Sequence, residues 1–295
     1  MQLSLGFLFA ILTSAFMGLA QVFIRRSTYR SAESFTPMAV SLLVGTPLFV
    51  FIVLAAGQWD ALFAFTWAQY ALLVGAGLIH FIVGRYLFFN GTRLIGANPT
   101  VAISQASIIF SVIIGVTVLR ETITALEVAG ALLIMAGAVM SSLDIGRRKF
   151  RISARGLLLG LGTALCVAGS GSLIRPVMEV SDAVYAATFI SYLSAFIIVV
   201  VLLLLGREQR EHVLRQGRRN FLVLLPAAVL LLVGHLFRFS AFKYSPVSIA
   251  QPLMGTIVIF TLVFSLAINR RIDVFNWRVL AGIVMVLAGV FLLYS

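Results

Sequence analysis

The chain has 295 residues, of which 61% are hydrophobic and only 11% are charged, and its formal net charge is +12. A soluble domain is about 25% charged, and a chain this apolar would expose large hydrophobic patches in water, so we interpret it as an all-α integral membrane protein. The positive charge does not indicate nucleic-acid binding, because Lys and Arg lie mainly in short gaps between apolar runs rather than on a basic face of a soluble domain.

Ten apolar runs are long enough to cross a bilayer, because a transmembrane helix needs about 20 mostly apolar residues. The first run lacks the basic residues that precede the apolar part of a signal peptide, so we do not expect it to be cleaved. The expected helices cover residues 3–24, 36–56, 67–91, 98–119, 126–143, 156–174, 183–206, 220–244, 247–268 and 276–294.

Helix-start signals precede three of these runs. Asn98 and Ser245 each stand directly before a proline, which predicts a capping side chain followed by proline at the first helical position. Thr124 and Glu127 have capping-box spacing at the start of the fifth run. Pro252, inside the ninth run, predicts a bend or a freed carbonyl group there.

The loops differ strongly in charge between the two sides of the expected membrane. Loops on one side hold seventeen Lys and Arg residues, whereas the other side holds only Arg120, Arg175 and Lys243. Basic loops stay in the cytoplasm. We therefore expect a multi-pass protein of the plasma membrane, the inner membrane of a bacterium, with both termini outside.

The two halves of the chain resemble each other at a constant offset of 150 residues, which becomes 152 near the end, where Gly130 pairs with Gly282. Five spans in each half force the second half to enter the membrane upside down. We expect two inverted five-helix repeats, 1–145 and 156–295, joined by a basic linker, 146–155. Such repeats build many secondary transporters, with the substrate site at the repeat interface. The identical pairs near the start are Gly6/Gly156, Leu8/Leu158, Thr13/Thr163, Ile24/Ile174 and Arg25/Arg175.

A family resemblance rests on two stretches. LRETITALEVAGALLIMAGAVM, residues 119–140, resembles the end of an EamA-type domain, and NWRVLAGIVMVLAGVFLL, residues 276–293, looks like its second copy. The whole chain is similar to the ten-helix, EamA-like members of the drug/metabolite transporter superfamily. The resemblance implies a central cavity between the first, third, fourth, sixth, eighth and ninth helices. Many relatives are drawn with cytoplasmic termini, whereas the loop charges favour termini outside.

The third and eighth expected helices each carry an arginine, Arg85 and Arg238. Arginine at a helix centre costs about 2.5–3.5 kcal/mol on insertion scales, which favours a partner or a watery cavity. At the repeat offset Arg85 is equivalent to His235, and His235 shares a helical face with Arg238 three residues later. His80 lies five residues before Arg85, about 140° around an α-helix, so we expect it to contribute less.

Each of these side chains also has a structural interpretation. Arg85 and Arg238 could snorkel to headgroups, and the two histidines could be hydrogen-bonded packing residues. Gln21, Asn90, Gln105 and Gln251 either line the cavity or bond a neighbouring helix. The predicted substrate-binding residues are Arg85, His235, Arg238, His80, Gln105, Gln251, Gln21 and Asn90.

All ten acidic residues lie in loops or at span ends, so the expected cavity is positive and should attract an anion. We expect a secondary transporter that moves a small organic anion or zwitterion, such as an amino acid, a carboxylate or a phosphorylated metabolite, by alternating access. The alternatives are a flippase for an anionic lipid or lipid-linked sugar, and an enzyme or scaffold. No P-loop or catalytic motif is present, and one cysteine with three histidines makes no metal site, so we expect no catalysis, cofactor or metal.

Overall fold

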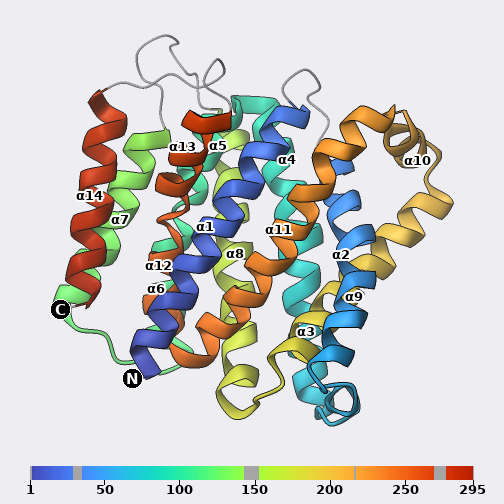
Figure 1. The fold of residues 1–295 in the computed structure, drawn as a ribbon. Coiled ribbons are helices and arrows are strands. Elements are labelled where there is room, and N and C mark those ends of the chain that lie inside the picture. The colour runs from blue at the N-terminus through green and yellow to red at the C-terminus, as the bar shows by residue number, and fades with distance from the viewer. Residues whose placement is uncertain (1, 29–34, 143–152, 216, 269–276, 295) are drawn as a thin grey trace.

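The computed structural model describes residues 2–28, 35–142, 153–215, 217–268 and 277–294 (Figure 1). Every regular element within these residues is helical. Ten helical segments are long and apolar enough to cross a membrane. The expected all-α architecture with ten transmembrane spans is therefore confirmed.

The first half of the chain forms five spans, of which the third and fourth are interrupted. The first, second and fifth spans are the single helices α1 (Gln2–Thr28), α2 (Phe35–Ala55) and α7 (Ala125–Ser142). The third span consists of α3 (Trp67–Gly77), the π-helical segment η2 (Leu78–Gly84) and α4 (Arg85–Ile95), preceded by the 3-10 turn η1 (Asp60–Phe63). The fourth span consists of α5 (Ala97–Ser104) and α6 (Ser107–Thr117).

The second half repeats this order with one addition. Its unbroken spans are α8 (Ala154–Val180), α9 (Val184–Leu205), α11 (Gly217–Tyr244) and α14 (Trp277–Tyr294). The ninth span of the chain, which is the fourth span of this half, is broken into α12 (Val247–Met254) and α13 (Ile257–Ile268). The addition is the short charged helix α10 (Arg207–Leu214), which lies between the seventh and eighth spans.

The helix boundaries follow the repeat offset found in the sequence. The third span begins at Trp67 and the eighth at Gly217, 150 residues later. The fourth span breaks after Ser104 and the ninth after Met254, again 150 residues apart. The bend expected from Pro252 is present, but the fourth span breaks at the same place without a proline in the preceding turn, so the fold of the repeat also requires this break.

The start signals have mixed outcomes. The capping box is confirmed, because Thr124 N donates to Glu127 Oε2 and Glu127 N donates to Thr124 Oγ1. The prediction for Asn98 is wrong. The N-cap of α5 is Gly96, which makes the sharp turn after α4 at φ 93°, a backbone angle that suits glycine. The prediction for Ser245 is also wrong, because a carboxylate from the other half caps α12, as described below.

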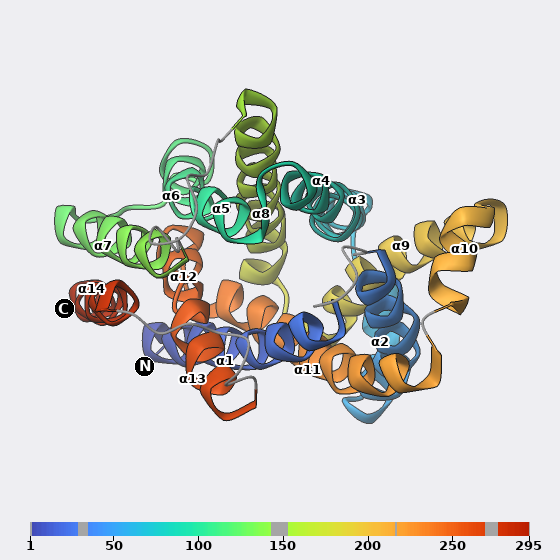
Figure 2. The ribbon, with the colours of Figure 1, turned by 90° about the horizontal axis from the view of Figure 1, so that it is seen from above.

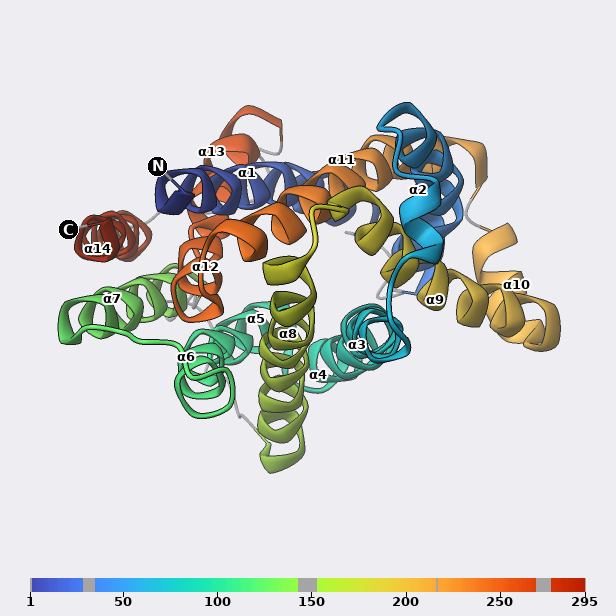
Figure 3. The same ribbon diagram turned by 90° about the horizontal axis from the view of Figure 1, so that it is seen from below.

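The two halves interlock through their first helices. The first helix of one half, α1, packs against α11 and α13 of the other half, and α8 in turn packs against α4 and α6 (Figures 2 and 3). The outer pair α7 and α14 also joins the two halves. Consequently α3, η2, α4, α8, α9 and α11 meet where the repeats face each other.

Glycines set the close approach of α7 and α14. A Cβ atom at Gly137 would lie 2.5 Å from the Gly282 carbonyl oxygen, and one at Gly130 would lie 2.8 Å from the Gly289 carbonyl oxygen. The two contacts are equivalent under the repeat, because Gly130 corresponds to Gly282 and Gly137 corresponds to Gly289. Small residues at such a crossing let the two backbones touch, which stabilises helix pairs in lipid.

Gly137→Leu is therefore expected to destabilise the protein. Overpacking a close interface costs about 1–3 kcal/mol, so the unfolding midpoint in detergent should fall by several degrees. The matched control is Gly169→Leu in α8, where an added Cβ meets no atom within 4 Å. Equal midpoints for the two variants in a thermal-shift assay would contradict this interpretation of the α7–α14 contact.

Candidate functional site

Four polar side chains from both repeats form one hydrogen-bonded chain, which we term the central network: His80, Ser170, His235 and Arg238. His80 lies on η2 of the first repeat, and its Nε2 lies 3.3 Å from His235 Nε2 on α11. Its Nδ1 lies 3.3 Å from Ser170 Oγ on α8, which accepts a 2.9 Å bond from Arg238 Nη2. Within this network the first repeat therefore joins the second through one imidazole.

A π-helical turn places His80 in this network. The expected angle of about 140° between His80 and Arg85 assumed an unbroken α-helix, and that assumption is wrong. Residues Leu78–Gly84 form a π-helix, in which the i→i+5 bonding widens the turn and rotates the side chains relative to an α-helix. Single π-turns are frequent at functional sites, and this one directs the imidazole toward α8 and α11.

The hydrogen-bond partners define the tautomers of both histidines. The Leu231 carbonyl oxygen lies 2.6 Å from His235 Nδ1 and can only accept, so Nδ1 carries the hydrogen. In a neutral His235, Nε2 then accepts from His80 Nε2–H. This leaves His80 Nδ1 to accept from the Ser170 hydroxyl. Two neutral imidazoles thus share one N–H between them.

Aromatic rings surround the imidazole of His235. Tyr192 on α9 is almost fully buried, and its hydroxyl lies 2.9 Å from His235 Nδ1. The Phe81 ring centroid lies 4.8 Å from the rings of both Tyr192 and His235. Sequence reasoning missed Tyr192 and Ser170. No signal could have found them, because the residues that correspond to them at the repeat offset, Leu42 and Ala20, are apolar.

The two arginines have different environments. Arg238 is 3% exposed, donates to Ser170 and to the Val167 carbonyl at 3.2 Å, and lies over the Phe242 ring at 4.9 Å. It is therefore packed between α8 and α11 and does not snorkel. Arg85 is half-buried over the Phe81 ring at 5.9 Å, and within the described residues its guanidinium makes no hydrogen bond or ion pair. Its donors are free for a ligand.

The remaining predicted site residues make no hydrogen bond to the central network among the described residues. Gln105 at the α5–α6 break and Gln251 in α12 have buried amide atoms, Nε2 and Oε1 respectively, without a partner. Asn90 donates to the Tyr86 carbonyl one turn earlier in α4, and Gln21 on α1 is exposed. Buried polar atoms without partners are uncommon in proteins, so Gln105 and Gln251 remain candidates for ligand contacts.

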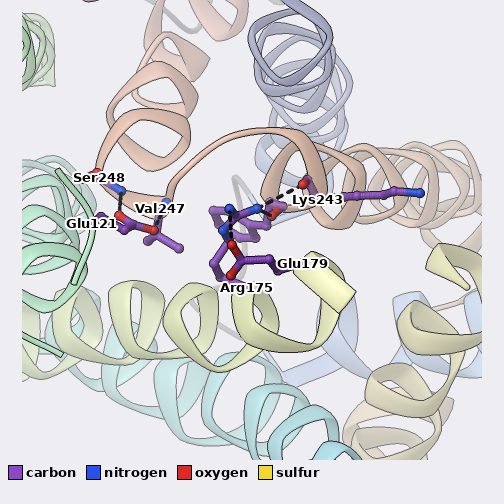
Figure 4. Close-up of polar contacts among 7 residues, drawn as sticks. Glu121, Arg175, Glu179, Lys243, Val247 and Ser248 are labelled. Carbon is purple, nitrogen blue, oxygen red and sulfur yellow. Dashed lines mark hydrogen bonds and ion pairs between the residues drawn. The ribbon is translucent and has the colours of Figure 1, made fainter. Parts of the chain in front are cut away.

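A second polar cluster holds the turn between α11 and α12, at the end of the bundle where α1 begins and α14 ends (Figure 4). Glu121, in the loop after α6, accepts bonds from Val247 N at 2.8 Å and Ser248 N at 2.9 Å. These amides open α12, where the helix dipole favours a negative charge. Glu121 thus caps a helix of the other repeat.

Arg175 on α8 secures the other side of the same turn. Its Nη1 donates to the carbonyl oxygens of Phe242 at 2.8 Å and Lys243 at 2.9 Å, which end α11 (Figure 4). Its Nη2 lies 3.3 Å from Glu179. We term Glu121 and Arg175 the end clamp, because together they fix the end of α11 and the start of α12.

The comparisons with known proteins agree with this architecture. The model of the EamA-like transporter family matches residues 4–143 and, separately, 154–295. The chain belongs to the EamA-like transporter family. Each match covers one five-helix half, in agreement with the inverted repeat.

A known crystal structure supports the fold of this EamA-like transporter. It superposes with a TM-score of 0.77 over 99% of this chain and 96% of that chain, at 16% sequence identity. Identity this low shows the fold alone. No curated protein matches the sequence. Membership of the family makes this a multi-pass membrane protein that transports small solutes.

Proposed function

We propose that the chain is a secondary transporter for a small organic anion or zwitterion. The proposal rests mainly on the position of Arg85 beside the central network, where the two repeats face each other. Arg85 lies over the Phe81 ring, and that ring packs against His235. Among the described residues, Asp and Glu occur only in loops, in the first or last turn of a span, or in η1 and α10. The cations at the junction therefore have no acidic neighbour within the described parts of the spans.

Arg85 is the residue we propose to bind the solute directly. Its guanidinium makes no hydrogen bond or ion pair among the described residues, and its planar donors match the two oxygens of a carboxylate or phosphate. A cationic drug would meet repulsion at this place, whereas an anion would compensate a charge that is costly to leave unpaired. An amino acid, a carboxylate and a phosphorylated metabolite all carry such a group.

Alternating access would use the inverted repeats. Transporters of this architecture expose a site between the repeats first to one side and then to the other. In the state described here Glu121 of the end clamp connects the two halves at the end where α1 begins. Release of Glu121 from α12 is the step we propose for opening that end.

Reconstitution in liposomes tests the function. Uptake of labelled alanine, succinate, glycerol phosphate and a cationic dye should show transport of one of the first three. Uptake limited to the dye would contradict the anion proposal. Movement of a labelled anionic lipid without uptake of any soluble solute would favour a flippase instead.

We propose that the basic loops face the cytoplasm and both termini face outward, because the positive-inside bias is strong. We also propose the division into repeats 1–145 and 156–295 with the linker 146–155, most of which lies outside the described residues. Reporter fusions after the last helix test the orientation. A cytoplasmic signal there would overturn it.

A further inference from the structure

We propose that the His80–His235 pair binds one proton together with the anion, so that the protein is a proton–anion symporter. This inference rests on the proposed function. It follows from the way the central network can hold one added proton and from the charges that surround it.

The network has a ready arrangement for one more proton. With a proton added, His235 Nε2–H donates to His80 Nε2, and the hydrogen on His80 moves to Nδ1, where it donates to Ser170 Oγ. The Ser170 hydroxyl then donates to the Val167 carbonyl, 2.8 Å away, while its oxygen still accepts from Arg238. The side chains of His80, Ser170, His235 and Arg238 each keep a partner of the correct type.

A second added proton has no such arrangement. It would place N–H groups on both Nε2 atoms, which face each other at 3.3 Å. Two donors at this distance repel, and two imidazolium charges would adjoin each other in a site shielded from water. The His80–His235 pair therefore has a capacity of one proton.

The surrounding charges make proton binding depend on the anion. Arg85 on α4 and Arg238 on α11 are positive neighbours of the pair, and Tyr192 on α9 is a neutral one. Cys166 on α8 faces η2, since a Cβ at Gly84 would lie 3.1 Å from its Cβ. No carboxylate among the described residues of these helices offsets the two guanidinium charges.

An anion held by Arg85 supplies the missing negative charge. It lowers the electrostatic cost of an imidazolium beside two arginines, and by reciprocity a bound proton strengthens anion binding. The two ligands are thus bound and released together. This is the opposite of a carboxylate site, where proton and cation compete and exchange in opposite directions. A monovalent anion carried with one proton moves no net charge.

Proton uptake can be counted in the purified protein. The binding enthalpies of succinate, alanine and glycerol phosphate are measured by calorimetry at pH 7.5 in buffers of different ionisation enthalpy. The slope of binding enthalpy against buffer ionisation enthalpy gives the number of protons taken up per bound anion. The expected value is about one, and the affinity should weaken about tenfold per pH unit above neutrality. The double variant His80→Gln/His235→Gln, which removes both imidazoles of the pair, should bring the proton count and the pH dependence of the affinity close to zero, whatever its absolute affinity.

The matched control is Asp182→Asn. The hydrogen bond from Lys243 holds the pKa of the exposed Asp182 carboxyl below its ordinary value, so this group stays charged from pH 5 to 8. Its ion pair is present above that pKa and is lost only as the pH falls through it. Asp182→Asn should therefore leave the proton count unchanged.

The outcomes separate the two proposals. Anion binding or uptake with a proton count near zero overturns the symport inference and leaves the transport function standing. A count near one that persists in His80→Gln/His235→Gln assigns the proton to another group and also overturns it. Failure of all three probes to bind and to be taken up at any pH contradicts the proposed function, and the inference fails with it.

Discussion

Arg85→Gln is expected to abolish measurable anion uptake while leaving the thermal stability unchanged. Losing a charge-assisted contact to a bound anion costs about 2–5 kcal/mol, or about 30-fold to several thousand-fold in affinity. The stability should not fall, because Arg85 makes no hydrogen bond or ion pair to protein among the described residues. Uptake in proteoliposomes and the unfolding midpoint in detergent are the two measurements.

Two further variants sharpen this result. Arg93→Gln removes an exposed arginine from the last turn of the same helix, α4, and should transport normally. Arg238→Gln should lower both transport and stability, because Arg238 is buried and bonded to α8 through Val167 and Ser170. Normal uptake in Arg85→Gln would refute the direct role of Arg85 and favour its interpretation as a structural residue.

Glu121→Gln is the second substitution with a large expected effect, since it should open the end of the bundle that the clamp holds. The carboxylate accepts two backbone bonds at the start of α12, and an amide has one acceptor oxygen and no charge to offer the helix dipole. A loss of about 2–3 kcal/mol would shift a two-state equilibrium by about 30- to 150-fold.

Spin labels measure the opening directly. In a Cys166→Ala background, labels at Thr122, next to Glu121, and at Val180, an exposed residue at the end of α8, should move apart in Glu121→Gln. The control is Glu127→Gln, whose carboxylate binds Thr124 within its own repeat and should leave the distances unchanged. Identical distance distributions in both variants would show that Glu121 does not hold this end closed.

The contacts also indicate which parts would move together. Arg238 bonds α11 to α8 through Val167 and Ser170, and Arg175 bonds the end of α11 to α8 again. Two such attachments should make α8 and α11 one rigid unit. Within the central network, His80 is the one side chain by which η2 bonds to this unit. The protonation state of the His80–His235 pair therefore acts where the first repeat meets the second.

The sequence by itself determined the ten spans, the repeat register and the equivalence of Arg85 and His235. The physical reason is that each depends on local properties or on order along the chain. Hydropathy over about 20 residues defines a span. The constant spacing between equivalent positions of the two repeats is visible in the positions of their glycines and helix breaks. The capping box of Thr124 and Glu127 was predictable for the same reason, since its partners are three residues apart.

Only the tertiary structure decided how the site is assembled. The cap of α12 comes from Glu121, 126 residues before Val247, so the local pattern at Ser245 pointed to the wrong partner. Ser170 and Tyr192 joined the site because α8 and α9 pack on η2 and α11. The π-turn at His80 is a departure from α-helical geometry that residue spacing does not encode. These features depend on contacts between segments far apart in the chain, and such contacts form only when the helices pack together.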